Sequence, residues 1–179
     1  PVAVARAHGD VADSRRIRIV WEGATYRGRN REVFWKGYMK LLDNRCARVS
    51  SFNFFNVDKP VRSASTGQHV EFDHVTTGNF AGIDLWLEEA VAGILQFRSN
   101  QADFDLDVAT IGAEDWKLEL GGLGKRIRIF RLPEEMTERR LVAEFPVALA
   151  SGVDNPLYVR ITQEDGHQAW SSPIYVHRE

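Results

Sequence analysis

The sharpest concentration of chemistry in the sequence is a short basic segment near the N-terminus. Arg27-Gly28-Arg29-Asn30-Arg31 places three guanidinium groups within five residues. Guanidinium forks bind phosphate and carboxylate groups through paired hydrogen bonds, so Arg27, Arg29 and Arg31 are candidate ligands for an anion. A hairpin loop whose arginines pair with carboxylates elsewhere in the chain explains the same segment.

Aromatic residues offer a second kind of binding site. Tyr26, Phe34 and Trp35 flank the basic segment, and their rings can stack on bases or sugars. Among the five tryptophans, Trp86 is the best candidate for an exposed ring, because it alternates out of phase with its two leucine neighbours. Trp86 therefore joins the three arginines as a candidate ligand-binding residue, for a carbohydrate or an anionic ligand.

The sequence lacks the common motifs of catalysis. It has no Gly-x-Ser-x-Gly elbow and no phosphate-binding loop, and the glycines of 121–126 precede a strand, which predicts a hairpin turn. His69, Glu71 and Asp73 share one face of a strand, where their tips spread apart, so we expect a solvated polar face. His74 falls on the opposite, apolar face. We predict no catalytic residue, no metal ligand and no cofactor.

Composition narrows the class of protein. The chain has 179 residues and a net charge of −2, which argues against an affinity for nucleic acid built on a basic surface. No apolar run approaches the roughly 18 residues of a membrane-spanning helix, so we expect a soluble protein without a membrane partner. Cys46 is the single cysteine and cannot form an internal disulfide. A lone thiol suits any compartment, and the cytoplasm is favoured.

The elements that position these residues are predicted to be strands. In 16–22, Ile17, Ile19 and Trp21 share one face while Arg16 and Arg18 lie on the other, which predicts a strand with one buried face. The same alternation returns in 126–129 and 157–162. Further strand candidates are 32–41, 45–51, 69–74, 83–87, 93–97, 104–108, 116–120, 139–149 and 173–177.

Turn signals separate these strands at short intervals. Asp43-Asn44 predicts a tight hairpin, and 111–116 predicts a single helical turn. Many short strands divided by turns favour an all-β fold, a β-sandwich of about 10–12 mainly antiparallel strands with at most one short helical turn. We expect an irregular N-terminal segment over 1–15 and one sandwich domain over 16–179.

The end of the chain carries a family resemblance. Residues 157–176 hold Tyr-Val-Arg at 158–160, then a turn, then Ala-Trp-Ser-Ser-Pro-Ile at 169–174. This pattern resembles the C-terminal β-rich region of uncharacterised bacterial proteins related to the PHP-type (polymerase and histidinol phosphatase) metallohydrolases. Segments 16–23 and 76–80 resemble the same region more diffusely. The resemblance implies that Trp170 and Ile174 fill the core, with Pro173 on an edge strand.

The resemblance also implies a function. Catalysis in that superfamily lies in an N-terminal domain with histidine-rich metal motifs, and no His-x-His occurs here. The chain would then be a non-catalytic accessory domain, cut from a longer chain, that packs against the catalytic domain of the same polypeptide and supports or shapes its cleft. Edge strands also make a homo-oligomer a partner to test. The alternative is a free-standing binding module for a carbohydrate or an anionic ligand.

Overall fold

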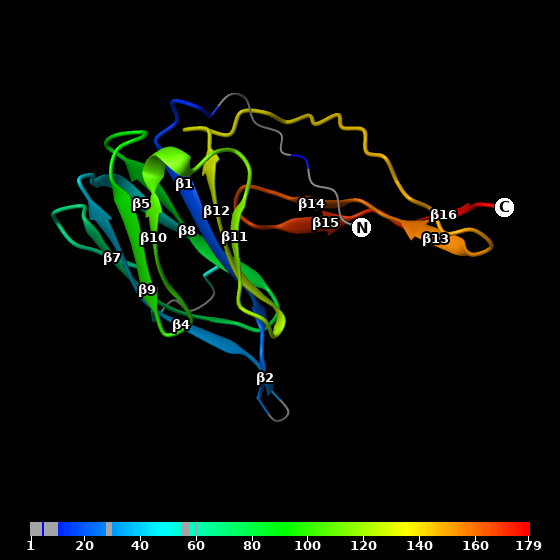
Figure 1. Ribbon diagram of the computed structural model, residues 1–179, viewed down its shortest axis with the longest axis horizontal. Coiled ribbons are helices and arrows are strands. Elements are labelled where there is room, and N and C mark those ends of the chain that lie inside the picture. The colour runs from blue at the N-terminus through cyan, green and yellow to red at the C-terminus, as the bar shows by residue number, and fades with distance from the viewer. Residues whose placement is uncertain (1–4, 6–10, 28–29, 55–57, 60) are drawn as a thin grey trace. The chain divides into compact units, whose positions relative to one another are not determined.

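The computed structural model confirms the all-β prediction. It describes residues 5, 11–27, 30–54, 58–59 and 61–179. Apart from one 3-10 turn, η1 (Val108–Thr110), every regular element in these ranges is a strand. The chain divides into two compact units, a sandwich unit, Gly9–Met136, and a C-terminal unit containing Thr137–Glu179 (Figure 1). No helix in the described ranges has the length and apolar character needed to cross a membrane.

Two five-stranded antiparallel sheets form the sandwich unit, and hydrogen bonds join each strand to its neighbours in the sheet. Sheet I has the order β11 (Trp116–Glu119), β12 (Leu123–Leu132), β1 (Arg16–Ala24), β8 (Phe80–Leu87), β5 (Cys46–Phe52). Sheet II has the order β10 (Asp103–Asp107), β9 (Ile94–Ser99), β4 (Val33–Leu42), β7 (His69–Thr76), β6 (Arg62–Ser63). A small ribbon of β2 (Tyr26–Arg27) and β3 (Asn30–Arg31) connects β1 to β4.

One apolar core lies between the two sheets. Ile17, Ile19 and Trp21 point into it from β1, as the alternation predicts, and all three are fully buried. The Trp21 ring stacks on Phe72 of sheet II with ring centroids 4.8 Å apart. Since the inner faces of both sheets supply large aromatic and branched side chains, the sandwich unit buries a core without help from the C-terminal unit.

The outer face of β1 departs from the prediction. The alternation assigns Arg16 and Arg18 to a solvent face, yet both are buried, together with Val20 beside them. β1 is the central strand of sheet I, and its outer face packs in a cluster with Phe130 of the adjacent β12 and Phe52 of β5, two strands away. Both faces of this strand are therefore covered, which alternation alone does not reveal.

The predicted hairpin at Asp43-Asn44 is wrong. The turn exists, with a positive φ of 55° at Asp43, but β4 belongs to sheet II and β5 to sheet I. The chain crosses between sheets here, and the Asn44 amide nitrogen anchors the crossing by donating hydrogen bonds to the carbonyls of Glu89 and Ala92, at 2.8 and 2.7 Å. Local turn chemistry is correctly recognised, whereas strand pairing depends on packing between distant segments.

The structure tests two further turn predictions. The single helical turn lies at Val108–Thr110 rather than at 111–116, because the Asp107 side chain accepts a hydrogen bond from the Ala109 amide, at 2.9 Å, and caps the turn there. By contrast, the glycine turn between β11 and β12 is confirmed, with positive φ at Gly121 and Gly122.

The C-terminal unit contains two short antiparallel ribbons. One pairs β13 (Asp154–Leu157) with β16 (Ile174–His177), and the other pairs β14 (Arg160–Thr162) with β15 (Gln168–Trp170). Segment 139–149, a predicted strand, has no strand pairing. The strands of the two large sheets all lie between Arg16 and Leu132, so the sandwich is shorter than the predicted 16–179.

Candidate functional site

Trp86 lies on the outer face of sheet I between two arginines. Register places Arg16 of β1, Trp86 of β8 and Arg48 of β5 in one cross-strand row. The guanidinium carbons of Arg16 and Arg48 lie over the indole at 4.7 and 4.2 Å from the ring centroid. The indole N–H faces the carbonyl of Glu134 at 3.4 Å. The ring is therefore partly buried and held by cation–π contacts.

A buried ion cluster adjoins this row. The Asp84 carboxylate accepts hydrogen bonds from Arg16 Nη2 at 2.5 Å and from Arg18 Nε at 2.6 Å, and all three side chains are less than a tenth exposed. The Arg18 guanidinium also lies 4.1 Å from the centre of the Phe52 ring. Ionic groups this deep are stable only when their hydrogen-bonding groups are paired, so Asp84 fixes both arginines in position.

These contacts define what the Trp86 region can do chemically. Arg48 is exposed and lies on β5, an edge strand of sheet I. A flat ligand that stacks on Trp86 must displace Arg48, whereas an anionic ligand can bind Arg48 without moving the ring. Arg16 and Arg18 are oriented toward Asp84 and act as a support for the row. Ligand binding at Trp86 stays a prediction.

The basic segment lies at the turn from β1 to β4. The backbone of Arg27 belongs to β2 and pairs with Asn30 of β3, while Arg29 lies outside the described residues. Arg31 ends β3 with an exposed side chain. Of the flanking aromatic rings, Trp35 is fully buried and donates a hydrogen bond to Thr76 Oγ1 at 2.8 Å. Anion binding by the arginines likewise stays a prediction.

The nucleophilic and basic side chains of the sandwich core are shielded. Burial raises the pKa of the Cys46 thiol to about 11, so the thiolate needed for nucleophilic attack is scarce at neutral pH. Burial lowers the pKa of His74 to about 4 and keeps the imidazole neutral. His74 stacks on Phe54 at 4.3 Å, on the apolar face that the sequence predicts.

Polar side chains contact one another on the face opposite His74. His69 Nε2 lies 3.4 Å from a Glu71 carboxylate oxygen, and Lys59 Nζ lies 3.0 Å from the Asp73 carboxylate. Within the described ranges, no three His, Cys, Asp or Glu side chains are placed to hold a metal ion. The arrangement is that of a solvated, charge-paired sheet face.

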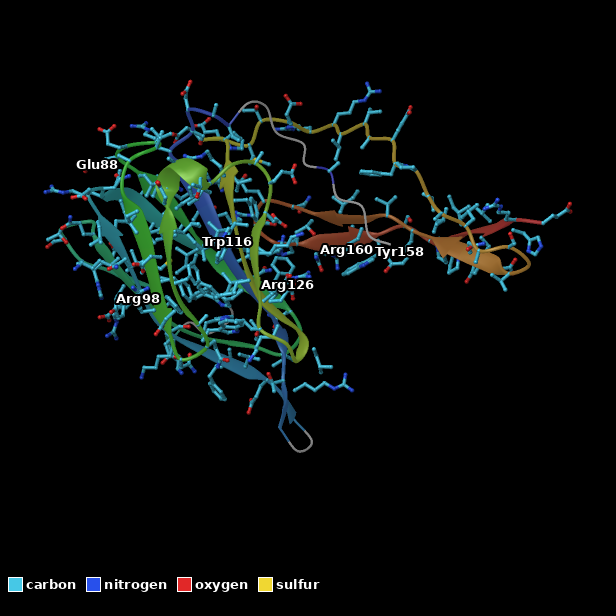
Figure 2. All side chains as sticks on the ribbon, in the orientation of Figure 1. Glu88, Arg98, Trp116, Arg126, Tyr158 and Arg160 are labelled. Carbon is cyan, nitrogen blue, oxygen red and sulfur yellow. The ribbon has the colours of Figure 1, made fainter. Side chains whose placement is uncertain are left out.

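The C-terminal unit overturns the roles that the resemblance implies for its aromatic segment. Trp170 and Ile174 are 57% and 69% exposed, so neither fills a core. Pro173 lies between β15 and β16 and outside both strands. The cause is architectural, because a two-stranded ribbon has no second layer against which to bury a side chain. Tyr158, labelled in Figure 2, is likewise exposed.

Comparisons of the chain with protein-family models, with curated proteins and with solved structures find no match. The functional conclusions therefore rest on the residues of this chain.

Two surfaces that the sequence patterns did not single out are the exposed apolar side chains of the C-terminal unit and the outer face of β4. For the latter a signal existed, since Phe34, Lys36, Tyr38 and Lys40 share one face of a single strand.

Proposed function

We propose that this chain is a non-catalytic accessory β-sandwich domain of a larger polypeptide, and that its C-terminal unit docks on a companion domain. The resemblance of 157–176 to the C-terminal region of PHP-type hydrolase relatives suggests a metal-dependent hydrolase domain as the companion. The role of the chain would be to support that domain or to shape its cleft.

The exposed apolar surface of the C-terminal unit carries this proposal. Its exposed large apolar side chains are Leu141, Val142, Phe145, Val147, Val153, Tyr158, Val159, Ile161, Trp170, Ile174 and Tyr175. None of them belongs to either hydrophobic cluster of the described residues. Exposed apolar surface on this scale is typical of a segment that binds another protein surface.

The physical properties of the ribbons favour docking over independence. Isolated two-stranded ribbons are marginally stable in water, because they bury little apolar area against the entropy of ordering the chain. Each ribbon here has only three or four residues per strand. Packing against a companion domain would bury Trp170 and Tyr175 and would stabilise both ribbons.

The mass of the native polypeptide is the first test. An immunoblot of source-cell lysate with antibodies raised against this chain should show a band well above 20.3 kDa. A single band near that mass would contradict the accessory role. Phosphoesterase activity of the isolated chain, assayed on p-nitrophenyl phosphate with added Mn²⁺ or Zn²⁺, would contradict the non-catalytic part of the proposal.

Hydrogen exchange tests the docking surface directly. Backbone amides in Arg160–Thr162 and Ile174–His177 should exchange more slowly in the native full-length polypeptide than in the isolated chain. Amides of β8 in the sandwich core serve as the control and should exchange equally slowly in both. Equal rates for the ribbons in the two samples would show that they are not covered.

A further inference from the structure

The outer face of sheet II carries two exposed aromatic rings on its central strand. Phe34 and Tyr38 of β4 are 40% and 38% exposed, while the alternating Trp35 and Met39 are buried in the core. More than a third of the surface of each residue is open to solvent, and the rest packs on the sheet. The two rings therefore offer apolar contact surface on a face that is otherwise polar.

The Tyr38 ring is held from one side by its neighbours on β7. It stacks on the His69 imidazole with ring centroids 4.9 Å apart and an interplanar angle of 26°. His69 in turn lies 3.4 Å from a Glu71 carboxylate oxygen. This contact restrains the ring and leaves part of its surface open to solvent, which lowers the entropy lost when a ligand stacks on it.

Polar side chains of alternating sign surround the ring. The cross-strand row through Tyr38 runs from β10 to β6 as Asp103, Arg98, Tyr38, Glu71 and Arg62. In the next row, Gln96 Nε2 donates to the Asp105 carboxylate at 3.1 Å, and that carboxylate also pairs with Arg98, at 2.5 Å. Figure 2 labels Arg98 on this sheet. Hydrogen-bond donors and acceptors are therefore interleaved around the rings.

This combination selects one class of ligand. Lys36 and Lys40 flank Tyr38 on the same face of β4, and the carboxylates around the ring offset their charge, so no strongly positive patch forms to attract a polyanion such as nucleic acid. Charged side chains are also depleted at the core of protein interfaces. A sugar ring suits the face, because its C–H groups pack on an aromatic ring while its hydroxyls both donate and accept hydrogen bonds. We propose that the Phe34–Tyr38 face of sheet II binds a neutral oligosaccharide. This role is independent of the docking proposed for the C-terminal unit.

The spacing of the rings sets the size of the ligand. Phe34 and Tyr38 are four residues apart on one strand, which separates them by about 13 Å. A single sugar ring cannot contact both side chains at that separation, whereas a chain of several sugars lying along β4 can. The face should therefore bind an oligosaccharide more tightly than the monosaccharide of the same kind.

Calorimetric titration of the 179-residue chain tests the proposal. The probes are neutral hexasaccharides of β-1,4-glucose, β-1,3-glucose, α-1,4-glucose, β-1,4-mannose and β-1,4-xylose, each with its monosaccharide. At least one hexasaccharide should bind with a Kd of about 1 mM or tighter, and Tyr38→Ala should weaken it about tenfold or more. Phe34→Ala should weaken it similarly, while Tyr38→Trp should keep binding within about threefold, since a ring is retained.

Matched controls separate this face from other exposed rings. Tyr175→Ala and Tyr158→Ala each remove an exposed tyrosine in the C-terminal unit. Both variants should bind the hexasaccharide as the unsubstituted chain does, and far-ultraviolet circular dichroism should confirm that each variant is folded. The absence of binding to every hexasaccharide, or an equal loss in Tyr175→Ala, would overturn the proposal.

Discussion

The sandwich unit and the C-terminal unit are built from the same kind of sequence with opposite results. In β1, alternating apolar residues meet a second sheet and become fully buried. In β14 and β16 the ribbons have no facing layer, and Ile161 and Ile174 remain exposed. Alternation determines which side chains share a face, whereas burial requires a surface opposite that face.

The ionisable groups of the two units differ in the same way. Asp84 in the sandwich unit is buried between two guanidinium groups. Asp165 in the C-terminal unit is exposed and contacts His167 at 3.0 Å. An exposed ion pair contributes little to stability, whereas loss of one partner from a buried cluster leaves a charge without compensation. The sandwich unit should therefore hold almost all of the stability of the isolated chain.

Substitution of a tryptophan should give the largest difference in stability effect between the two units. Trp35→Ala removes a buried ring and its hydrogen bond to Thr76, and should lower the free energy of unfolding by about 3–5 kcal/mol. Trp170→Ala removes an exposed ring and should change it by less than about 0.5 kcal/mol. Urea unfolding followed by circular dichroism measures both. Similar losses in the two variants would mean that Trp170 is buried within the chain.

Loss of the carboxylate from the buried ion cluster should lower stability almost as much. Asp84→Ala leaves Arg16 and Arg18 without their shared carboxylate and should lower the free energy of unfolding by about 3–5 kcal/mol. Asp165→Ala is the matched change in the C-terminal unit, and its effect should stay below about 0.5 kcal/mol. The same urea experiment compares the two. If Asp84→Ala leaves the free energy of unfolding unchanged, water must reach the cluster.

His74 should make the stability of the sandwich depend on pH. Its pKa is near 6.5 when unfolded and about 4 in the fold, so between these values the unfolded state binds more protons. The contribution of His74 to the free energy of unfolding is fully present above pH 6.5. About 3 kcal/mol of it is lost as the pH falls to 4. His74→Phe should flatten this part of the profile, while His167→Phe in the C-terminal unit should not. Unfolding in urea at a series of pH values from about 7 to about 4 tests the difference.

Removal of the whole C-terminal unit should also change the stability of the sandwich unit only slightly. A chain ending at Met136 keeps both sheets and both hydrophobic clusters, so its free energy of unfolding should fall by less than about 1 kcal/mol. The midpoint of urea unfolding measures this. A loss of several kcal/mol would show that the two units are coupled in the isolated chain, and it would weaken the contrast between them.

Several features could be predicted from the sequence for plain physical reasons. The period of two in 16–22, with Trp21 in phase with two isoleucines, indicates a strand and its core face. The core position of His74 follows from its place in phase with the apolar residues of β7. The turn at Asp43-Asn44 is also visible, because short polar residues tolerate the backbone that it needs. These are local properties of a few neighbouring residues.

The candidate site was harder to predict. Trp86 alternates out of phase with its leucine neighbours as expected, but its two arginine contacts arise from strands far away in sequence. Burial of Arg16 and Arg18 likewise depends on Asp84, which lies in the middle of an otherwise apolar strand. An acid in the middle of an apolar strand is a signal for an internal ion cluster, but the sequence patterns did not single it out.

The sequence by itself determined that this protein is built from strands and which side chains share a face, because strand geometry repeats every two residues. Only the tertiary structure decided which strands pair, that β4 and β5 belong to different sheets, and which faces are covered. The reason is that burial is a long-range property. The same alternation gives a closed core in the sandwich unit and an exposed apolar surface in the C-terminal unit, depending on whether a second layer is present.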